Sequence, residues 1–345
     1  MFPTHVGVNR RQDRDGKKAN CQVAVSVHYV SPLGHYPLDL QPDLPDSWLT
    51  DKKRLDRAGV PRDRRQAQTK PEIALALLDR VRAEGLPGRV VVADAGYGVS
   101  GDFRAGLEQR GLSYVVGVAG DFVVFARPPP WLPPVGTGNG RPRTRPRLAP
   151  DNPRPVALSA LAGRVRREPV CRREGTKGKL SGRFARLRVW PGHGGATGDC
   201  ADAKAVWLLI EEQADGTTKY AFSNLPVGTR RLRAVRLWKS RWPVEQGYQQ
   251  LKEELGLDHF EGRSWRGLHH HAAMTLLAFG FLLLERRHVE QARPGGEKRG
   301  FRAARTRADA TGHPAGVATP ADVPGQAGLC LLPRTATAPD PRVTE

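Results

Sequence analysis

The feature that most constrains the fold of this chain is a short apolar run, Val90-Val91-Val92-Ala93, that ends in Asp94. An uninterrupted apolar strand is usually central in a sheet and covered on both faces. A capped helical pattern precedes it over residues 69–85, and a second helix and a second strand are expected over residues 103–110 and 113–118. This alternation of strands and helices predicts an α/β fold.

Further strands are expected on both sides of this core. Residues 20–30 alternate apolar and polar side chains and are expected to pair with residues 35–40 in an antiparallel hairpin. Residues 127–155 are rich in Pro, Gly and Arg, which predicts an irregular loop. Residues 229–238 and 268–286 have helical patterns. Three short β-prone runs predict a β-rich insertion: residues 184–190, 205–211 and 219–223.

These patterns divide the chain into four segments. They are a first part of the core over residues 1–126, a Pro/Arg-rich loop and β-rich insertion over 127–228, a last part of the core over 229–289, and a tail over 290–345. The tail mixes Ala, Gly, Pro, Arg and Thr with little periodicity. That composition predicts disorder, or a sequence that arose by frameshift.

The charge balance favours a polyanionic partner. The chain has 55 Lys and Arg against 35 Asp and Glu, a net charge of +20, so nucleic acid is the leading candidate. An arginine-rich bias from a GC-rich coding sequence is the alternative source of part of this charge. The four cysteines form no C-x-x-C pair, which fits a reducing cytoplasm. The longest apolar run, residues 274–284, is too short to span a bilayer and is expected to be a buried helix, so no membrane partner is predicted.

A second feature bears directly on chemistry. Arg241, Glu245 and Lys252, here called the Arg-Glu-Lys triplet, follow one another at intervals of four and seven residues. On one continuous helix these side chains share a narrow arc, because there are 3.6 residues per turn. The carboxylate can hold a divalent cation, and the two cations can neutralise phosphates along the helix. A solvated face with ordinary ion pairs is the alternative.

Asp94 is the second candidate acid. A central strand that ends in a carboxylate delivers it to the carboxyl edge of the sheet, where α/β folds bind ligands. The alternative is an Asp that caps the next helix. Together, Asp94 and Glu245 suit a site for two divalent metal ions, which stabilise the attacking and leaving oxygens in phosphoryl transfer.

At these two motifs the chain resembles the DDE-superfamily transposases of bacterial insertion sequences. Val-Val-Ala-Asp-Ala-Gly-Tyr-Gly around Asp94 is similar to the second acidic motif of that family. The triplet matches the family's Tyr-x2-Arg-x3-Glu-x6-Lys signature, with Trp238 in place of the usual tyrosine. The run over residues 255–265 is similar to the segment that follows this signature in one branch of the family.

The resemblance implies a ribonuclease-H-like core of the α/β class, interrupted by a β-rich insertion between the second and third acidic motifs. It implies that Asp94 and Glu245 are catalytic metal ligands, with Mg2+ or Mn2+ as the cofactor. The DNA-binding residues that it implies are Trp238, Arg241, Lys252, Arg263 and Trp265. The implied partner is double-stranded DNA, at transposon ends and at the target, bound by a cytoplasmic homodimer. The family reaction is hydrolysis at the transposon end, followed by attack of the freed 3′-hydroxyl on target DNA.

One of the family's three acids does not lie where the resemblance would place it. That position, ahead of the hairpin, falls before Met1, and the nearest acids, Asp13 and Asp15, lie in a predicted turn. A site that lacks one of three carboxylates binds its cations poorly, so we expect an N-terminally truncated transposase with little or no activity. The alternatives are a non-catalytic DNA-binding remnant or inhibitor, and a metal-dependent nuclease of the same fold outside transposition.

Two further basic features are expected to have simpler roles. His269, His270 and His271 point about 100° apart on a helix, so they cannot jointly face one metal ion and are expected to serve structure or DNA backbone contact. The remaining candidate phosphate contacts are residues 17–18, 62–65, 141–147 and 164–173.

Overall fold

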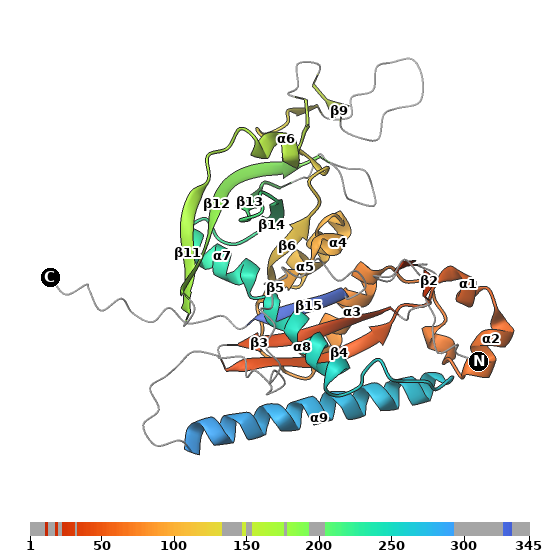
Figure 1. The fold of residues 1–345 in the computed structure, drawn as a ribbon. Coiled ribbons are helices and arrows are strands. Elements are labelled where there is room, and N and C mark those ends of the chain that lie inside the picture. Colours follow the sequence, from red (N-terminus) through yellow and green to blue (C-terminus); the bar gives the residue numbers. More distant parts are fainter. Residues whose placement is uncertain are drawn as a thin grey trace, which may run out of the picture. The chain divides into compact units, whose positions relative to one another are not determined.

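A computed structural model of the protein describes residues 11–12, 18–19, 23–31, 33–132, 147–149, 154–175, 178–192, 204–292 and 327–332 (Figure 1). The chain divides into two compact units. Unit 1 comprises Met1–Leu77 and Pro243–Gly328, and unit 2 comprises Leu78–Trp242 and Leu329–Glu345.

Unit 1 is built on an antiparallel hairpin. Strand β3 (Ala24–Ser31) pairs with strand β4 (Gly34–Pro42), and the register shifts between Val27 and His28. The predicted hairpin is therefore confirmed. Alternation predicts a strand with one solvent face, but β3 is buried on both faces, since the polar Ser26 and His28 are buried as well as Val25 and Val27.

After β4 the chain forms short helices around a small apolar cluster. These are α1 (Asp46–Leu49), α2 (Lys52–Ala58) and the 3-10 helix η1 (Arg62–Arg64). The cluster consists of Trp48, Leu55, Ala58 and Val60, with Leu44 and Trp265 packed against it. Helix α2 ends at Gly59, whose φ of 67° lies in the left-handed region that favours glycine.

Helix α3 (Lys70–Ala83) begins with the predicted capping box. The backbone N–H of Thr69 donates to the Glu72 carboxylate at 2.7 Å, and the Thr69 hydroxyl accepts from the Glu72 N–H at 3.4 Å. The hydrogen bonds from Thr69 lower the pKa of Glu72. The apolar face of α3 is buried at Ile73, Leu77, Leu78 and Val81, as its helical pattern predicts, whereas Leu75, which belongs to the same pattern, is half-buried.

Two later helices of unit 1, α8 (Trp242–Glu253) and α9 (Trp265–Ala292), lie along the hairpin (Figure 1). Helix α9 approaches β4 so closely that a Cβ atom on Gly280 would lie 2.8 Å from the Tyr36 ring. The Tyr36 hydroxyl donates to the Leu276 carbonyl at 3.1 Å. Glycine at position 280 is therefore what lets the helix pack against the strand.

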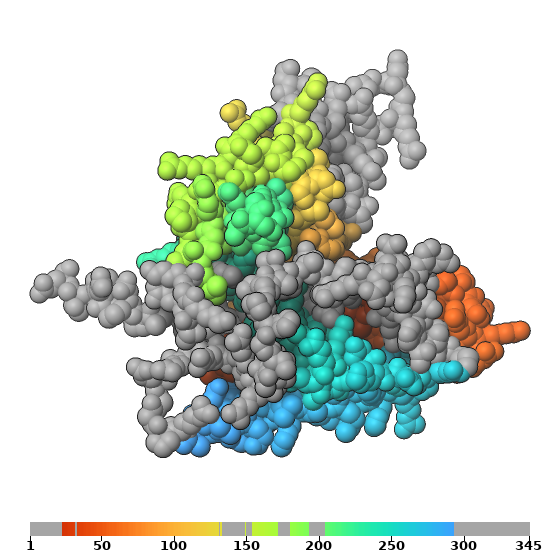
Figure 2. Space-filling model, in the orientation of Figure 1, coloured from red at the N-terminus to blue at the C-terminus, as the bar shows by residue number. Residues whose placement is uncertain are grey.

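The outer face of α9 differs from the prediction. The apolar run over residues 274–284 was expected to be buried, but Met274, Leu277, Phe281 and Leu284 are each more than half exposed. Figure 2 shows α9, coloured cyan to blue, as a band of open surface. By length and composition α9 is able to cross a membrane, and 17% of its most apolar window is buried. The prediction failed because the run continues a longer helix, of which only one face meets the hairpin.

Unit 2 contains a mixed sheet centred on two parallel strands. Strand β5 (Val90–Ala93) is fully buried and runs parallel to β6 (Ser113–Val118). Beyond β6 three antiparallel strands follow in order: β14 (Thr218–Ser223), β13 (Val206–Glu212) and β12 (Gly178–Pro191). Strand β12 also pairs with β11 (Glu168–Gly175) and with β7 (Val123–Phe125). Strand β7 in turn pairs with β10 (Val156–Ala157). The expected β-rich insertion is thus present between the segments that contain Asp94 and Glu245.

The helices of unit 2 are short. They are α4 (Ala95–Gly98), α5 (Gly101–Gln109), α6 (Leu158–Ala162) and α7 (Arg231–Lys239). Two pairs of two-residue strands complete the described chain, β1 (Arg11–Gln12) with β2 (Lys18–Ala19), and β8 (Trp131–Leu132) with β9 (Arg147–Leu148). The second pair lies in the segment that was expected to be an irregular loop.

The predicted tail contains one regular element. Strand β15 (Ala327–Leu332) pairs antiparallel with β5, with Cys330 opposite Val92. The expectation of a tail without structure is therefore wrong for this strand. The sequence could not indicate it, because six residues of strand pattern acquire their hydrogen bonds only from a partner more than 200 positions away.

Candidate active site

Asp94 lies at the carboxyl end of β5, where the sequence predicted it. It is also the N-cap residue of α4, because its Oδ1 atom accepts a hydrogen bond from the Gly96 N–H at 2.9 Å. The carboxylate is half-buried. Both interpretations of this residue thus hold for its position, since it is at once an acid at a strand end and a helix cap.

Close backbone contact fixes α4 and with it Asp94. A Cβ atom on Gly98 would lie 1.9 Å from the Gly117 carbonyl oxygen, and one on Gly117 would lie 2.8 Å from the Ala95 nitrogen. Real Cβ atoms do not come so near, so α4 and β6 require glycine at both positions. The glycine after Tyr97 in the Asp94 motif therefore serves helix packing.

A buried arginine secures the other end of α4. Arg104 of α5 is 7% exposed and donates a hydrogen bond to the Gly98 carbonyl. Its guanidinium also lies over the rings of Phe122 and Phe222, at 5.8 and 5.4 Å from their centroids. Burial lowers the pKa of Arg104. Sequence analysis missed this residue, because an arginine in a short amphipathic helix is ordinarily exposed.

The Arg-Glu-Lys triplet does not lie on one continuous helix. Helix α7 ends at Lys239, Arg241 lies in the following turn, and α8 begins at Trp242, so Glu245 and Lys252 alone share a helical face. Pro243 explains the break, because proline lacks an N–H and disfavours the helical conformation of the residue before it. The prediction of a single helix was therefore wrong for Arg241.

Glu245 and Lys252 occupy favourable ends of α8. Glu245 is in the first turn and Lys252 in the last, so each charge complements the helix dipole. Both are half-buried, since they border the face that buries Val244, Tyr248 and Leu251. A carboxylate and an amine seven residues apart thus lie in one line at the margin of the packed face.

That packed face is held by polar groups. The Tyr248 hydroxyl donates to the Ser26 hydroxyl of β3, and Ser26 also contacts His28 Nε2 at 3.1 Å. The rings of His28 and Tyr248 lie 5.2 Å apart. A Cβ atom on Gly247 would lie 2.8 Å from His35 Cε1, so glycine again permits the close approach.

Burial changes the acid–base properties of this polar contact. It lowers the pKa of His28 to about 3, with a further contribution from His35, and lowers the pKa of His35 to about 4, with a further contribution from Arg286. Burial raises the pKa of Tyr248 to about 12, against a smaller opposing effect of its bond to Ser26. All three groups are therefore neutral near pH 7, which suits a contact between a helix and a buried strand.

The predicted DNA-binding aromatics also have packing roles. Trp238, on α7, meets the buried Phe184 ring edge-on at 6.4 Å. Trp265, at the start of α9, packs against the apolar cluster of unit 1 and lies 4.3 Å from the His269 ring. Arg263 is exposed in the loop before α9.

Several predicted phosphate contacts are used within the protein. Arg65 donates to the Val60 carbonyl and pairs with Asp56 at 2.6 Å, and Arg167 pairs with Glu212 at 3.3 Å. Residues 141–146 lie outside the described residues, as do Lys17, Asp13 and Asp15.

The adjacent histidines follow the expectation that they serve structure. His269 Nδ1 contacts the Trp265 carbonyl at 2.9 Å, and His271 Nε2 contacts the Gly256 carbonyl at 3.0 Å. His270 is exposed. These contacts direct the three rings to different surroundings.

Carboxylate oxygens are the donors that Mg2+ and Mn2+ prefer, so the chemistry of Asp94 and Glu245 fits either ion. Within the described residues, no three His, Cys, Asp or Glu side chains form a group that could hold a metal. Asp94 belongs to unit 2 and Glu245 to unit 1. The two candidate acids thus belong to different units of the chain.

A mixed α/β fold with a β-rich insertion, and with an acid at the end of a central parallel strand, defines a ribonuclease-H-like nuclease core. The family model of the DDE superfamily endonucleases matches residues 2–179, more than half of the chain. The chain therefore belongs to the DDE superfamily of endonucleases, which are transposase-like enzymes that act on DNA. No curated protein shows a significant match to the chain.

The matched span contains the hairpin and Asp94 and ends before Glu245. The family predicted from the two sequence motifs is thereby confirmed. The roles of Asp94, Glu245 and the DNA-binding residues stay predictions.

Proposed function

We propose that the protein is a transposase of the kind that cleaves and joins DNA by phosphoryl transfer, with a low rate because Asp94 and Glu245 are the two acids identified for its metal ions. Asp94 and Glu245 bind divalent metal ions, Mg2+ or Mn2+, which when bound activate the attacking oxygen and stabilise the leaving one. Water attacks a phosphodiester at the end of the mobile element and the bond from phosphorus to O3′ breaks. The freed 3′-hydroxyl then attacks a phosphodiester of the target and displaces its 3′-oxygen.

The observation that carries this proposal is the position of Asp94. It lies at the carboxyl end of β5, within the span that matches the DDE superfamily endonucleases, and its helix is anchored through Gly98. A half-buried carboxylate fixed in this way is held ready for a ligand, because it loses little conformational freedom when it binds one.

The cationic residues near Glu245 are assigned to binding the DNA phosphates. Lys252 lies in line with Glu245 on α8, and Arg241 precedes that helix. We assign both to the phosphates that flank the reacting bond, and Trp238, Arg263 and Trp265 to the adjoining DNA. Phosphate contacts of this kind position the duplex without reading its sequence.

Cleavage of duplex DNA that carries the ends of the mobile element tests the proposal. The wild-type protein is expected to nick it in Mg2+ or Mn2+, and Asp94→Asn and Glu245→Gln to reduce the rate by a hundredfold or more. The asparagine retains an oxygen that can cap α4, so its effect reports on charge rather than on helix stability. Glu253→Gln, an exposed site on the same helix as Glu245, is the control and should retain full activity.

A second function, DNA binding without catalysis, is favoured by one observation. The Asp94 carboxylate already caps α4, and no third acidic or imidazole ligand groups with it among the described residues. Such a protein would occupy the ends of a mobile element, or pair with an active transposase as an inhibitor.

Metal dependence separates the two functions. If DNA affinity is the same with and without Mg2+ and is unchanged by Glu245→Gln, while falling steeply with salt, the protein is a binder. Cleavage that Asp94→Asn abolishes supports the enzyme. Cleavage without joining to a target would instead identify a nuclease outside transposition.

A further inference from the structure

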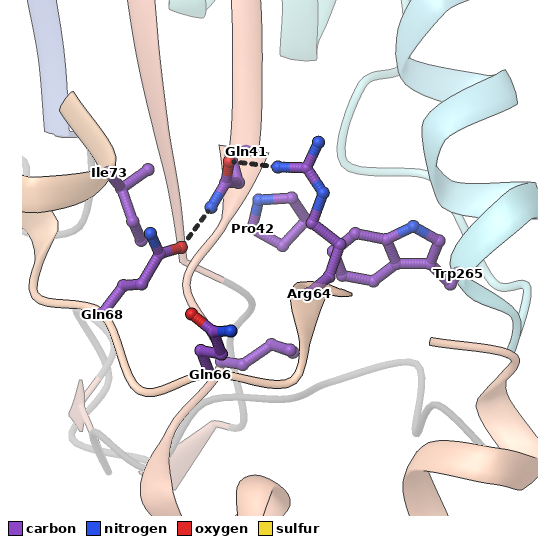
Figure 3. A pocket seen from close by; sticks show the side chains of 8 residues that line it. Gln41, Pro42, Arg64, Gln66, Gln68, Ile73 and Trp265 are labelled. Atoms are coloured by element: carbon purple, nitrogen blue, oxygen red, sulfur yellow. Dashed lines mark hydrogen bonds between the residues drawn. The ribbon is translucent and has the colours of Figure 1, made fainter. Parts of the chain in front are cut away.

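Unit 1 contains a surface hollow with an unusual lining (Figure 3). It is a shallow recess, open to solvent, between the end of β4, η1 and the segment after it, the first turn of α3 and the start of α9. About 250 Å3 of space, part of it open solvent, lies between its lining residues. Its lining residues are Gln41, Pro42, Leu44, Arg64, Gln66, Gln68, Ile73 and Trp265. Of the residues assigned above to catalysis or DNA binding, Trp265 alone is among these lining residues.

The polar groups of the hollow are held in a chain. Gln41 is 6% exposed, its Nε2 donates to Gln68 Oε1 at 2.9 Å, and its Oε1 accepts from Arg64 Nη1 at 3.3 Å. Figure 3 shows these two bonds, with the Gln66 side chain rising toward the other lining residues. The buried amide thus orients Arg64 and Gln68, whose remaining N–H groups are available to a ligand.

The apolar groups form a flat and rigid boundary. Trp265 packs against the apolar cluster of Trp48, Leu55, Ala58 and Val60, which restricts its indole ring. Pro42, Leu44 and Ile73 add aliphatic surface beside it. A rigid aromatic edge next to oriented amides favours a planar ligand that both stacks and forms hydrogen bonds.

The balance of charge limits the ligand further. Arg64 is the single cation among the lining residues, and its Nε lies 3.4 Å from the Asp63 carboxylate. A phosphate site would use several cations or a row of backbone N–H groups. Three primary amides and one guanidinium match instead the donor and acceptor edge of a nucleobase, for which Gln and Arg are frequent partners.

We infer that this hollow binds a single unstacked nucleobase of DNA, with Gln66, Gln68 and Arg64 on the base edge and Trp265 beside its face. The inference rests on the proposed function, since DNA is the source of the base. A base displaced from the duplex would give the protein a contact that depends on base identity, which phosphate contacts do not supply.

The indole N–H signals of 15N-labelled protein test this site directly. The chain has seven tryptophans, and Trp265→Phe, which keeps an aromatic ring, assigns the relevant signal. Titration with deoxyadenosine 5′-monophosphate should shift the Trp265 signal in a saturable way, whereas 2-deoxyribose 5-phosphate, which lacks the base, should not. Gln66→Leu should weaken the nucleotide at least about fivefold.

Gln249→Leu provides the control, because Gln249 is an exposed glutamine of unit 1 on α8. It should leave the titration unchanged. Equal shifts with both ligands would show a phosphate site, and no shift, or a shift that Gln66→Leu does not alter, would also overturn the inference.

A duplex with one unpaired adenine separates this result from the proposed function. The wild type should prefer it to the fully paired duplex, and Gln66→Leu should lose that preference. If no duplex binds but the mononucleotide does, the nucleobase site stands and the proposed function fails. If duplex DNA is bound and cleaved without any response of Trp265, the proposed function stands and the site does not.

Discussion

The two candidate acids are positioned by different kinds of contact. Helix α4, which Asp94 caps, lies against β6 through the backbone contact of Gly98 with Gly117. Helix α8, which carries Glu245, lies against the hairpin through Gly247 and the buried Tyr248, Ser26 and His28 side chains. The first contact is steric and does not titrate, whereas the second includes groups whose pKa values burial has moved. The Glu245 region should therefore respond to pH and the Asp94 region should not.

The largest expected effect comes from Gly98→Ala. The new methyl group would meet the Gly117 carbonyl at 1.9 Å, which backbone movement alone can relieve. We expect unit 2 to lose about 3 kcal/mol or more of stability, measured by denaturant unfolding. Gly228→Ala is the matched control, since nothing lies within 4 Å of its added Cβ. Equal stability of the two variants would refute the steric anchor.

The second-largest expected effect is a loss of stability around α8 on acidification. His28 and His35 have folded pKa values of about 3 and 4, below the ordinary value of 6.5, so the unfolded state binds more protons between these limits. Stability is full above pH 6.5 and falls as the pH drops toward 4, by about 1 kcal/mol per pH unit for each histidine. Hydrogen exchange of peptides from β3 and α8 at pH 7 and pH 5 measures this loss.

Peptides from β5 and α4 provide the internal comparison, and their protection should change less. His28→Leu should reduce the pH dependence, while His270→Gln, at an exposed position, should leave it as it is. If peptides of both units lose protection equally, the two acids are not held by different contacts.

A smaller effect is expected from Gly247→Ala. The added methyl group would lie 2.8 Å from the His35 ring, which is itself buried and has little room to move. We expect a loss of about 1–3 kcal/mol in unit 1 and a lower rate of DNA cleavage, because Glu245 would shift with its helix. Combining Gly247→Ala with His35→Ala should recover part of the stability, whereas an additive loss would place the strain elsewhere.

The smallest effect concerns the cap on α4. Asp94→Ala should cost about 1 kcal/mol because the Gly96 N–H loses its acceptor, and Asp94→Asn should cost a few tenths. Thermal unfolding measures both variants. If both abolish cleavage although their stabilities differ, the carboxylate has a role beyond the cap.

Much of the local structure follows from the sequence. The apolar run at residues 90–93 gave its strand, the Thr69 and Glu72 pair gave the start of α3, and alternation gave the hairpin of β3 and β4. Each of these depends on residues within a few positions, so a pattern in the sequence contains the required information. The motif around Asp94 led to the correct superfamily for the same reason.

Other features could not be predicted, because their partners are far apart in the chain. The break before α8 was foreseeable from Pro243, but the exposure of α9 depends on which of its faces meets the hairpin. Arg104 has no sequence signal that marks it as buried, and its aromatic neighbours are distant in the chain, since Phe122 lies in the loop before β7 and Phe222 in β14. The hollow of unit 1 likewise combines residues from positions 41 to 265.

The sequence by itself determined the strands, the helix caps and the superfamily, since these depend on local periodicity and on motifs with fixed spacing. The tertiary structure decided what holds each candidate acid in place. Tyr248 and Ser26 are 222 residues apart in the chain, and Gly98 needs Gly117 to approach before the lack of a side chain matters. Such contacts depend on the distance between atoms after folding, which no pattern along the chain specifies.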